Sequence, residues 1–411
     1  MSENQFWIKV MEAKFSSFSS LIEPIQPDEF FSDYWEKKPL HVKRSDKQYY
    51  KDLITLGNVQ SALSFGGLRY PSIQLSKSGA FLHPDVFCSD IRSGEIVFSG
   101  VPDLDKLQAE YKSGATLSLP GFNRAWKPLM TLAAAVEEYL SHAVHTNIYI
   151  TPGNASGFTP HYDAHEVFIL QISGTKHWKI FDPPLNLPHH SQAFKPHMLT
   201  PSLPLMELDL EPGDLLYLPR GFVHAANSLE NASMHVTLGV TVFTYVELMT
   251  SWLHSSKNEL AIRKALPPGF ANHPELQASI KSEFSRLVEE FKQKLDSKQV
   301  VDGFIQRVRE GYPGRSECRQ EIELNVSVIN PNTKLKILTP DQYTISEDGE
   351  NIVLEFGEKT MIMSKRARPL LDEMSKRTLF QPTELFTDLK EDTKLTLIRH
   401  LYQEGFLLLC P

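Results

Sequence analysis

The 411-residue sequence has few cysteines, no long apolar run and no excess of basic residues. Its three cysteines, Cys88, Cys318 and Cys410, lie far apart without Cys-x-x-Cys spacing, which excludes a disulfide framework and a cysteine-based zinc site. A protein without a disulfide framework is typical of a reducing compartment, so we expect a cytoplasmic protein. The 42 basic and 50 acidic side chains give a net charge of −8, which argues against a chain built mainly to bind nucleic acid.

Export and membrane segments are also missing from the pattern. Residues 1–15 contain glutamates and lysines and lack the apolar core of about 7 residues that a signal peptide needs. The longest apolar stretches, such as residues 239–249, are much shorter than the roughly 20 residues that cross a bilayer. We therefore expect no membrane association.

Three parts of the chain differ in hydrophobic period, and we predict one domain in each: residues 1–255, 256–319 and 320–411. The first part contains a predicted amphipathic helix, residues 128–144, followed by short runs rich in Val, Ile, Leu, Phe and Tyr. These candidate strands are residues 147–150, 166–172, 177–181, 214–218 and 235–243. Short apolar runs bounded by Gly and Pro are typical of a β-sandwich or barrel.

The second part changes to a helical period. One apolar stripe recurs at steps of three and four residues and consists of Leu276, Ile280, Phe284, Leu287, Val288, Phe291 and Leu295. It predicts a helix of about five turns that begins near Pro274, and residues 303–308 suggest a second helix. The stripe fits equally well with packing against a neighbouring domain and with a helical dimer interface.

The third part resembles a winged helix in its order of elements. We predict a strand at residues 324–329, a hairpin at 347–356, and a helix through Ile398 that ends at Gly405 before a short closing strand. Residues 321–411 contain 11 basic and 15 acidic side chains, a net charge of −4. Because a DNA-binding face must be basic, a structural role is favoured over DNA reading.

Two histidines and one aspartate have the spacing of metal ligands. His161 and Asp163 lie two residues apart at the entry to a β run, so their side chains leave the same face of an extended chain. His224 follows a Pro-Arg-Gly turn within residues 213–224, a spacing that reproduces the second cupin signature. That turn would bring His224 back toward the barrel interior.

This donor set indicates a particular kind of metal. Two neutral nitrogens and one carboxylate occupy one face of an octahedral ion and leave positions open, as in non-haem Fe(II) oxygenases. A structural zinc site would be closed and tetrahedral. A His-x-Asp pair alone is weak in a chain with 15 histidines, and satisfied core histidines are the alternative. The added turn before His224 makes metal binding the stronger interpretation.

Other polar residues fall near this constellation. Lys176 begins a predicted strand, and its ammonium would need an anion if it pointed into the barrel; the alternative is a lysine exposed at a strand edge. His165 follows His161 and Asp163 at the same two-residue step. We interpret it as a residue that supports the site or faces the substrate, with metal ligation as the alternative. His235 is another candidate neighbour of the site.

At this point the residues resemble a known family. The chain is similar to JmjC-type, cupin-like 2-oxoglutarate oxygenases of the ribosomal oxygenase group, and the resemblance runs nearly end to end. The similar segments are residues 34–44, 146–163, the spacing to Lys176, the helical block and the acidic tail. The resemblance implies an α+β fold: a double-stranded β-helix (cupin or jelly-roll) JmjC barrel, a helical dimerisation region and a C-terminal winged-helix-like domain.

The resemblance also implies roles for individual residues. His161, Asp163 and His224 would bind Fe(II), and Lys176 would pair with the C5 carboxylate of 2-oxoglutarate. The resemblance implies three further cosubstrate contacts, Asn147, Tyr149 and Thr237. Two departures from the family stand out: the motif at residues 161–166 reads HYDAHE where better-known members have HYDD, and the serine that some members have near Gly239 is absent.

The expected activity is oxidative. Such an enzyme would use Fe(II), 2-oxoglutarate and O2 to hydroxylate an amino-acid side chain of a protein or peptide, with succinate and CO2 as co-products. A ribosomal protein is one candidate substrate, and a homodimer is expected. Demethylation of N-methyl-lysine by the same chemistry is an alternative. A non-catalytic scaffold or DNA-associated protein that uses the winged helix is another.

Overall fold

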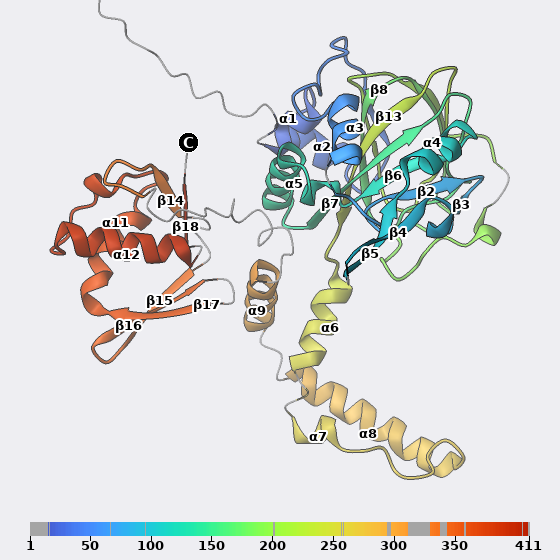
Figure 1. Cartoon of the computed structure of the whole chain (residues 1–411). Coiled ribbons are helices and arrows are strands. Elements are labelled where there is room, and N and C mark those ends of the chain that lie inside the picture. Colours follow the sequence, from blue (N-terminus) through green and yellow to red (C-terminus); the bar gives the residue numbers. More distant parts are fainter. Residues whose placement is uncertain are drawn as a thin grey trace, which may run out of the picture. The chain divides into compact units, whose positions relative to one another are not determined.

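The structure is a computed structural model, and the chain divides into two compact units, Met1–Val242 and Phe243–Pro411 (Figure 1). The residues that it describes are 15, 17–65, 67–94, 96–199, 202–255, 257, 259–293, 297–310, 329–337, 343–356, 359–404 and 406–409. None of the helices in this described part of the chain combines the length and the hydrophobicity that a bilayer-spanning helix needs. The division into residues 1–255, 256–319 and 320–411 stays a prediction.

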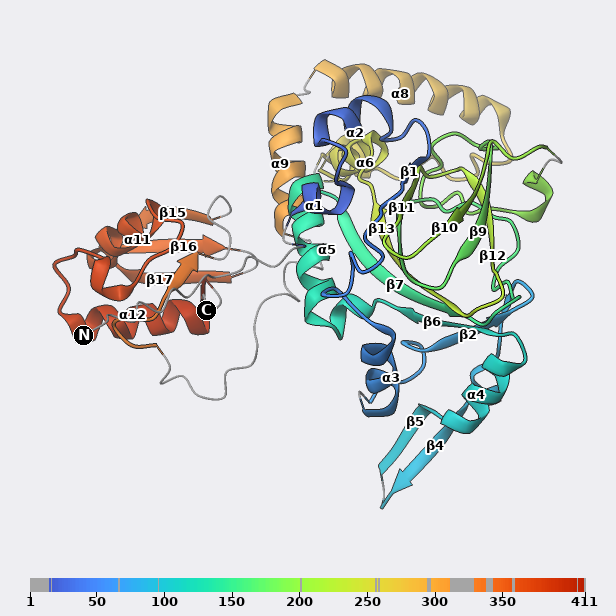
Figure 2. The same cartoon turned by 90° about the horizontal axis from the view of Figure 1, so that it is seen from above.

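Two antiparallel sheets form the barrel of the first unit. The large sheet contains, in spatial order, β1 (Leu40–Val42), β11 (Leu215–Leu218), β8 (Glu166–Ser173), β13 (Ser233–Thr241), β7 (Ala143–Thr151), β6 (Thr116–Pro120), β2 (Gln74–Lys77) and β3 (Ala80–Phe81). The small sheet contains β10 (Met206–Leu210), β9 (Lys176–Phe181) and β12 (Val223–Ser228). Figure 2 shows the small sheet opposite β7, β11 and β13. The predicted barrel of short strands is confirmed.

Strand β8 is apolar along most of its length because both of its faces are buried. Phe168 and Leu170 point to the outer face, into the core that the covering helices share. Val167 and Ile169 point inward and pack with Trp178 and other residues of the small sheet. The alternation along this strand therefore separates an outer apolar core from the inside of the barrel.

Helices cover the outer face of the large sheet. They are α1 (Phe18–Ile22), α2 (Pro27–Asp33), α3 (Leu56–Phe65), α4 (Leu104–Lys112) and α5 (Lys127–Leu140), and a separate hairpin consists of β4 (Cys88–Ser93) and β5 (Ile96–Pro102). The predicted helix at 128–144 was wrong at its end. Ser141 has a φ of 54°, a left-handed conformation that ends α5, and the chain enters β7 at Ala143. Apolar residues continue across this boundary, so periodicity alone did not show it.

A buried ionic network joins the two chain segments that carry the candidate metal ligands. The Glu166 carboxylate is fully buried and accepts hydrogen bonds from the Tyr217 hydroxyl (2.5 Å) and the Arg220 guanidinium (2.7 Å). Arg220 also contacts Glu36. The next residue, Gly221, donates its N–H to the carbonyl of Asp163 at 3.0 Å. The Arg220 turn is thereby attached to the strand that follows Asp163.

The second unit combines helices with a small α/β core. Its helices are α6 (Tyr245–Ser255), α7 (Leu260–Arg263), α8 (Pro274–Gln293), α9 (Ser297–Glu310), α11 (Arg368–Ser375) and α12 (Glu391–Gln403). Its sheets pair β14 (Leu335–Ile337) with β18 (Leu407–Leu409), and β15 (Tyr343–Asp348) with β16 (Asn351–Phe356) and β17 (Lys359–Ser364). The predicted helix start at Pro274 and the hairpin at 347–356 are confirmed. Most of the predicted strand 324–329, and Gly405, lie outside the described residues.

The buried network leads to a prediction about stability. Arg220→Met should lower the free energy of unfolding by about 3–5 kcal/mol, because it leaves the Glu166 carboxylate buried without its cationic partner. Urea denaturation followed by far-ultraviolet circular dichroism measures this change. Lys179→Met is the matched control: it breaks an ion pair to Glu207 whose two side chains are 46% and 44% exposed, and it should change stability little. Equal effects of the two substitutions would contradict the role given to Arg220.

Candidate active site

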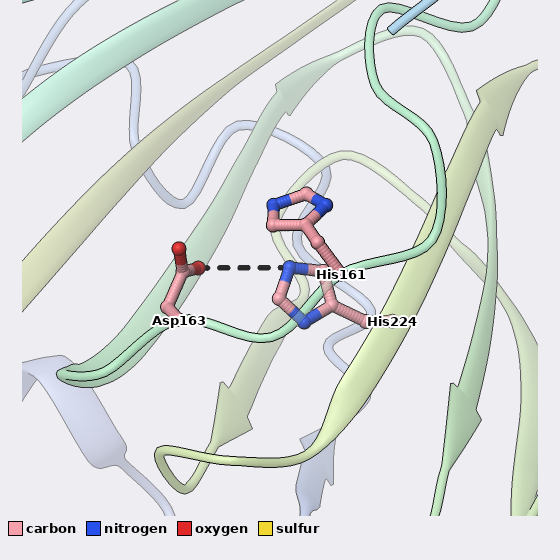
Figure 3. A group of neighbouring side chains, drawn as sticks. All are labelled: His161, Asp163 and His224. Carbon is pink, nitrogen blue, oxygen red and sulfur yellow. Dashed lines mark ion pairs between the residues drawn. The ribbon is translucent and has the colours of Figure 1, made fainter. Parts of the chain in front are cut away.

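The structure brings His161, Asp163 and His224 together at one end of the barrel. One ligand atom from each lies within 4.8 Å of the others, and His224 Nε2 is 3.6 Å from the carboxylate of Asp163. Figure 3 shows the three side chains pointing toward one another. The backbones of His161 and His224 exchange two N–H···O hydrogen bonds, of 2.8 and 3.2 Å. This direct pairing of two distant segments places both imidazoles beside the same aspartate.

Backbone carbonyls orient both imidazole rings. Nδ1 of His161 lies 2.8 Å from the carbonyl of Thr159, and Nδ1 of His224 lies 3.1 Å from the carbonyl of Phe222. Since a carbonyl oxygen only accepts, each Nδ1 donates in these hydrogen bonds, which leaves Nε2 of each ring as the nitrogen that can bind a metal. Metal-binding histidines use this arrangement, in which the second nitrogen is held by an acceptor.

The charges of the three side chains suit a divalent cation. Burial lowers the pKa of His224 to about 4, so its imidazole is neutral. Burial alone would raise the pKa of Asp163, but the neighbouring histidines, His165 first among them, outweigh it and the net shift is downward. Two neutral nitrogens and one carboxylate fit an ion with further open positions and fall one ligand short of a closed zinc site. His165 is not part of this donor set.

A cavity of about 380 Å³ extends from these three residues between the two sheets. Its lining, as far as the chain is described, consists of Phe81, Thr116, Asn147, Tyr149, Gly157, Phe158, His161, Asp163, His165, Val167, Ile169, Lys176, Trp178, His224, Ala225, Ala226, His235 and Thr237. The four residues that the resemblance assigned to the cosubstrate are all among them. Their assigned roles stay predictions.

Lys176 points into this cavity and is 5% exposed, so it is not the edge lysine of the alternative interpretation. Its ammonium donates to the Thr151 hydroxyl at 3.2 Å and lies 5.9 Å from the centre of the Trp178 ring. Among the described residues no carboxylate pairs with it. Burial lowers the pKa of Lys176 to about 7. A buried ammonium without a counter-ion is costly, and a carboxylate bound in the cavity would supply one.

Asn147, Tyr149 and Thr237 occupy inward positions on adjacent strands. Thr237 of β13 lies directly opposite Asn147 of β7, and His235 lies opposite Tyr149. The Asn147 side-chain oxygen accepts the N–H of Gly121 at 3.1 Å. Burial and then the Asp163 carboxylate raise the pKa of Tyr149 to about 12, against a hydrogen bond from Asn147. The phenol therefore stays protonated and can donate a hydrogen bond to an anion.

The structure adds residues to the site that the sequence analysis did not assign. His235 is 3% exposed and stacks on Tyr149 with ring centres 5.0 Å apart; it had been given only as a neighbour. Trp178 lies two residues after Lys176 and shares its inward face, a signal that the strand period contained. Phe81 and Phe158 come from a short strand and a loop, where no periodic signal exists.

The burial of Lys176 predicts how the stability of the ligand-free protein depends on pH. With a folded-state pKa of about 7, the folded protein has released this proton between pH 7 and 10 whereas the unfolded chain has kept it. The free energy of unfolding therefore gains from this group as pH rises through that range. Below pH 7 the full cost of the buried charge remains. Lys176→Met should thus stabilise the protein at pH 6, by roughly 5 kcal/mol at most, and much less at pH 10.

Chemical denaturation of both proteins across this pH range, without added anions, measures the difference. Lys179→Met, on the exposed face of the same strand, should show no such pH dependence. A destabilising effect of Lys176→Met at pH 6 would mean that the ammonium has a strong anionic partner within the protein.

The chain is similar in sequence to known proteins. Residues 123–248 match the family model described as "JmjC domain". A Culex quinquefasciatus protein named bifunctional lysine-specific demethylase and histidyl-hydroxylase NO66 is 28% identical over 62% of this chain and 40% of its own length. Ribosomal oxygenase 2 of Mus musculus is 29% identical over 70% of this chain and 62% of its own. This chain therefore spans less than two thirds of the length of either relative.

Solved structures of the Escherichia coli ribosomal oxygenase YcfD share the fold. One covers 94% of this chain and 98% of YcfD with a TM-score of 0.50 and 20% identity. Another, of YcfD in complex with cobalt and 2-oxoglutarate, has a TM-score of 0.51 and 16% identity over 94% of this chain and 99% of YcfD. The expected cupin-like fold and the resemblance to this family are confirmed, and the part of the chain that resembles a JmjC domain is residues 123–248.

Proposed function

We propose that this chain is an Fe(II)- and 2-oxoglutarate-dependent oxygenase that hydroxylates an amino-acid side chain of a protein or peptide. The observation that carries the proposal is the buried Lys176 ammonium, which lacks a carboxylate partner in the described structure and shares one cavity with His161, Asp163 and His224. A metal ion with open positions would bind the three donor residues. A dicarboxylate cosubstrate would supply the anion that the Lys176 ammonium needs.

The protein's own groups would bind and orient the reactants. Nε2 of His161, Nε2 of His224 and the Asp163 carboxylate would hold Fe(II), which, when bound with 2-oxoglutarate, supplies O2 activation coupled to the release of succinate and CO2. Lys176 would pair with the distal carboxylate of the cosubstrate, and the Tyr149 phenol would donate a hydrogen bond. Asn147 and Thr237 are the further proposed contacts. Aromatic walls around the cavity would exclude bulk water and so strengthen these interactions.

The names of relatives support the substrate class. They include histidyl-hydroxylase, lysine-specific demethylase and ribosomal oxygenase, and a YcfD structure contains cobalt and 2-oxoglutarate. We therefore take a ribosomal protein as the candidate substrate. Removal of an N-methyl group from lysine by the same chemistry is the second candidate. A complete donor set beside a cavity argues against a purely non-catalytic scaffold.

Turnover of 2-oxoglutarate tests the proposal. Succinate should form from 2-oxoglutarate only with Fe(II) and O2, and His161→Ala or Asp163→Ala should abolish it, because each removes one of three ligands.

Mass spectrometry of proteins from a deletion strain and its parent should reveal a substrate that carries one added oxygen atom in the parent alone. Formaldehyde release from methylated peptides, without a stable oxygenated product, would instead indicate the demethylase. Purified protein that binds neither Fe(II) nor 2-oxoglutarate would overturn the oxygenase assignment.

We also propose the finer organisation that the sequence suggested. Residues 256–319 would form a dimerisation region in a homodimer, and residues 320–411 a winged-helix-like domain with a structural role and no direct nucleic-acid binding. The apolar stripe of α8 supports the first point, because Phe284 is 65% exposed and Val288 is 45% exposed. The buried, unpaired thiol of Cys88 is compatible with a cytoplasmic location.

The dimer proposal predicts a change of assembly. Phe284→Glu combined with Val288→Glu should convert a dimer into a monomer, since each substitution would bury a charge in an apolar interface. Sedimentation velocity measures the mass directly. Ser282→Glu, on the opposite face of the same helix, adds a charge away from the stripe and should leave the dimer intact. An unaltered protein that sediments as a monomer would contradict the proposal.

A further inference from the structure

The loop before the first metal ligand is longer than the strand segment that it faces. We call residues 155–161 the ligand loop. At its start the Ala155 carbonyl accepts the N–H of Ser228 at 3.0 Å, and at its end His161 pairs with His224. Five residues separate 155 from 161 in the loop, whereas three separate 224 from 228 in β12. The loop must therefore bow away from β12, and its carbonyl groups need partners elsewhere.

Two carbonyl groups of the bowed part connect the metal ligand to a separate hairpin. The Thr159 carbonyl accepts a hydrogen bond from Nδ1 of His161 at 2.8 Å and so orients the imidazole. The Gly157 carbonyl accepts the N–H of Gly79 at 3.2 Å. Since Gly79 lies in the turn between β2 and β3, this hydrogen bond attaches the ligand loop to that turn.

Gly157 allows the ligand loop to lie directly on the large sheet. It is buried, and a Cβ atom at this position would lie 2.7 Å from Oγ1 and 2.9 Å from Cβ of Thr116. Thr116 is itself buried in β6, and its hydroxyl donates to the Thr151 hydroxyl at 3.1 Å. Because the strand backbone fixes the Cβ of Thr116, a side chain at residue 157 would push the loop away from the sheet.

Gly79 leaves a similar space for Thr159. Its φ is 86°, and a Cβ atom at residue 79 would lie 2.6 Å from Cγ2 and 3.2 Å from Oγ1 of Thr159. The next residue, Pro160, restricts the backbone of Thr159 to extended conformations. A displacement of Thr159 would therefore be passed on to the carbonyl that faces His161.

We propose that Gly79 and Gly157 are positioning residues for the metal: they allow the β2–β3 turn and β6 to hold the ligand loop in place, and this sets the direction of the His161 imidazole. The proposal rests on metal binding by the three donor residues, which is part of the function proposed above. A site of this kind needs its ligands within roughly 10–20° of the productive direction.

The two supporting elements come from outside the part of the chain that resembles a JmjC domain. That part is residues 123–248, whereas β2 and β3 lie within Gln74–Phe81 and β6 is Thr116–Pro120. The N-terminal segment would thus contribute to the metal site without supplying a ligand. Metal affinity should then respond to substitutions in it that leave all three donor side chains unchanged.

Metal binding by the full-length protein, without turnover, tests the proposal. The electron paramagnetic resonance signal of free Mn(II) gives the affinity. Gly157→Ala should weaken Mn(II) binding by about 10- to 100-fold, the usual loss when the support of a ligand histidine is disturbed. The visible absorption spectrum of bound Co(II) should also change, because it reports the ligand geometry. Gly57→Ala in α3 is the matched control: its Cβ would meet Thr55 at an ordinary 3.8 Å, and both readouts should stay unchanged.

The second glycine allows a rescue experiment. Gly79→Ala should weaken Mn(II) binding by at least about tenfold. Thr159→Ala removes Cγ2 and Oγ1 and leaves a Cβ that would lie 3.4 Å from the new methyl carbon. In a Thr159→Ala background, Gly79→Ala should therefore cost less than about threefold. These variants decide the question alone if Gly157→Ala does not fold.

Gly94→Ala controls for the strain of a side chain at positive φ. Gly94 has a φ of 62° in the turn between β4 and β5, and a Cβ there would meet no atom of the described chain within 4 Å. The substitution therefore adds the backbone strain without the contact. Mn(II) binding should stay as it is in the unaltered protein.

Three results would overturn the proposal. The first is Mn(II) binding by Gly157→Ala or Gly79→Ala that is as tight as that of the unaltered protein. The second is an equal loss in Gly57→Ala or Gly94→Ala, which would attribute the effect to stability or backbone strain. The third is a loss from Gly79→Ala that persists in the Thr159→Ala background. An unaltered protein that binds no Mn(II) is a different result, because it would overturn the proposed metal site and this inference with it.

Discussion

The pair of backbone hydrogen bonds between His161 and His224 is the constraint on which the site depends. These residues are far apart in the sequence, and only the closure of the small sheet against the entry to β8 brings them into register. The buried Glu166–Arg220 contact and the Gly221 N–H to Asp163 carbonyl bond fix the same junction from the outside. Because the metal donors are held by backbone pairing, their positions depend on the barrel and less on side-chain freedom.

Side chains alternate between the two faces of each strand, and this alternation separates the residues that line the cavity from the residues that pack in the apolar core. Outward residues of β8 enter the apolar core, while inward residues of β7, β9 and β13 supply the polar lining of the cavity. A buried polar lining is expensive unless its groups are paired. Lys176 and His235 are incompletely paired in the described structure, and both face the volume where ligands are proposed to bind. The unpaired groups therefore indicate where binding energy is available.

The sequence was sufficient for the barrel and for the candidate ligands, and the reasons are physical. A His-x-Asp pair before a strand and a Pro-Arg-Gly turn before a histidine are local patterns, and each constrains side-chain direction through a few bonds. The end of α5 was misjudged because the left-handed turn at Ser141 depends on tertiary packing. The contact between Thr159 and the β2–β3 turn could not be predicted, since it joins two distant segments and depends on a missing side chain at residue 79.

The burial of Lys176 also affects how stable the protein is when no anion is bound in the cavity. A barrel that holds an ammonium without a counter-ion unfolds more readily than the same barrel with an anion bound, by an amount that grows with the logarithm of anion concentration. Transient opening of the fold exposes it to proteases in proportion to the population of the open state. The abundance of this protein in a cell would then follow the local supply of dicarboxylates, independently of how often it turns over.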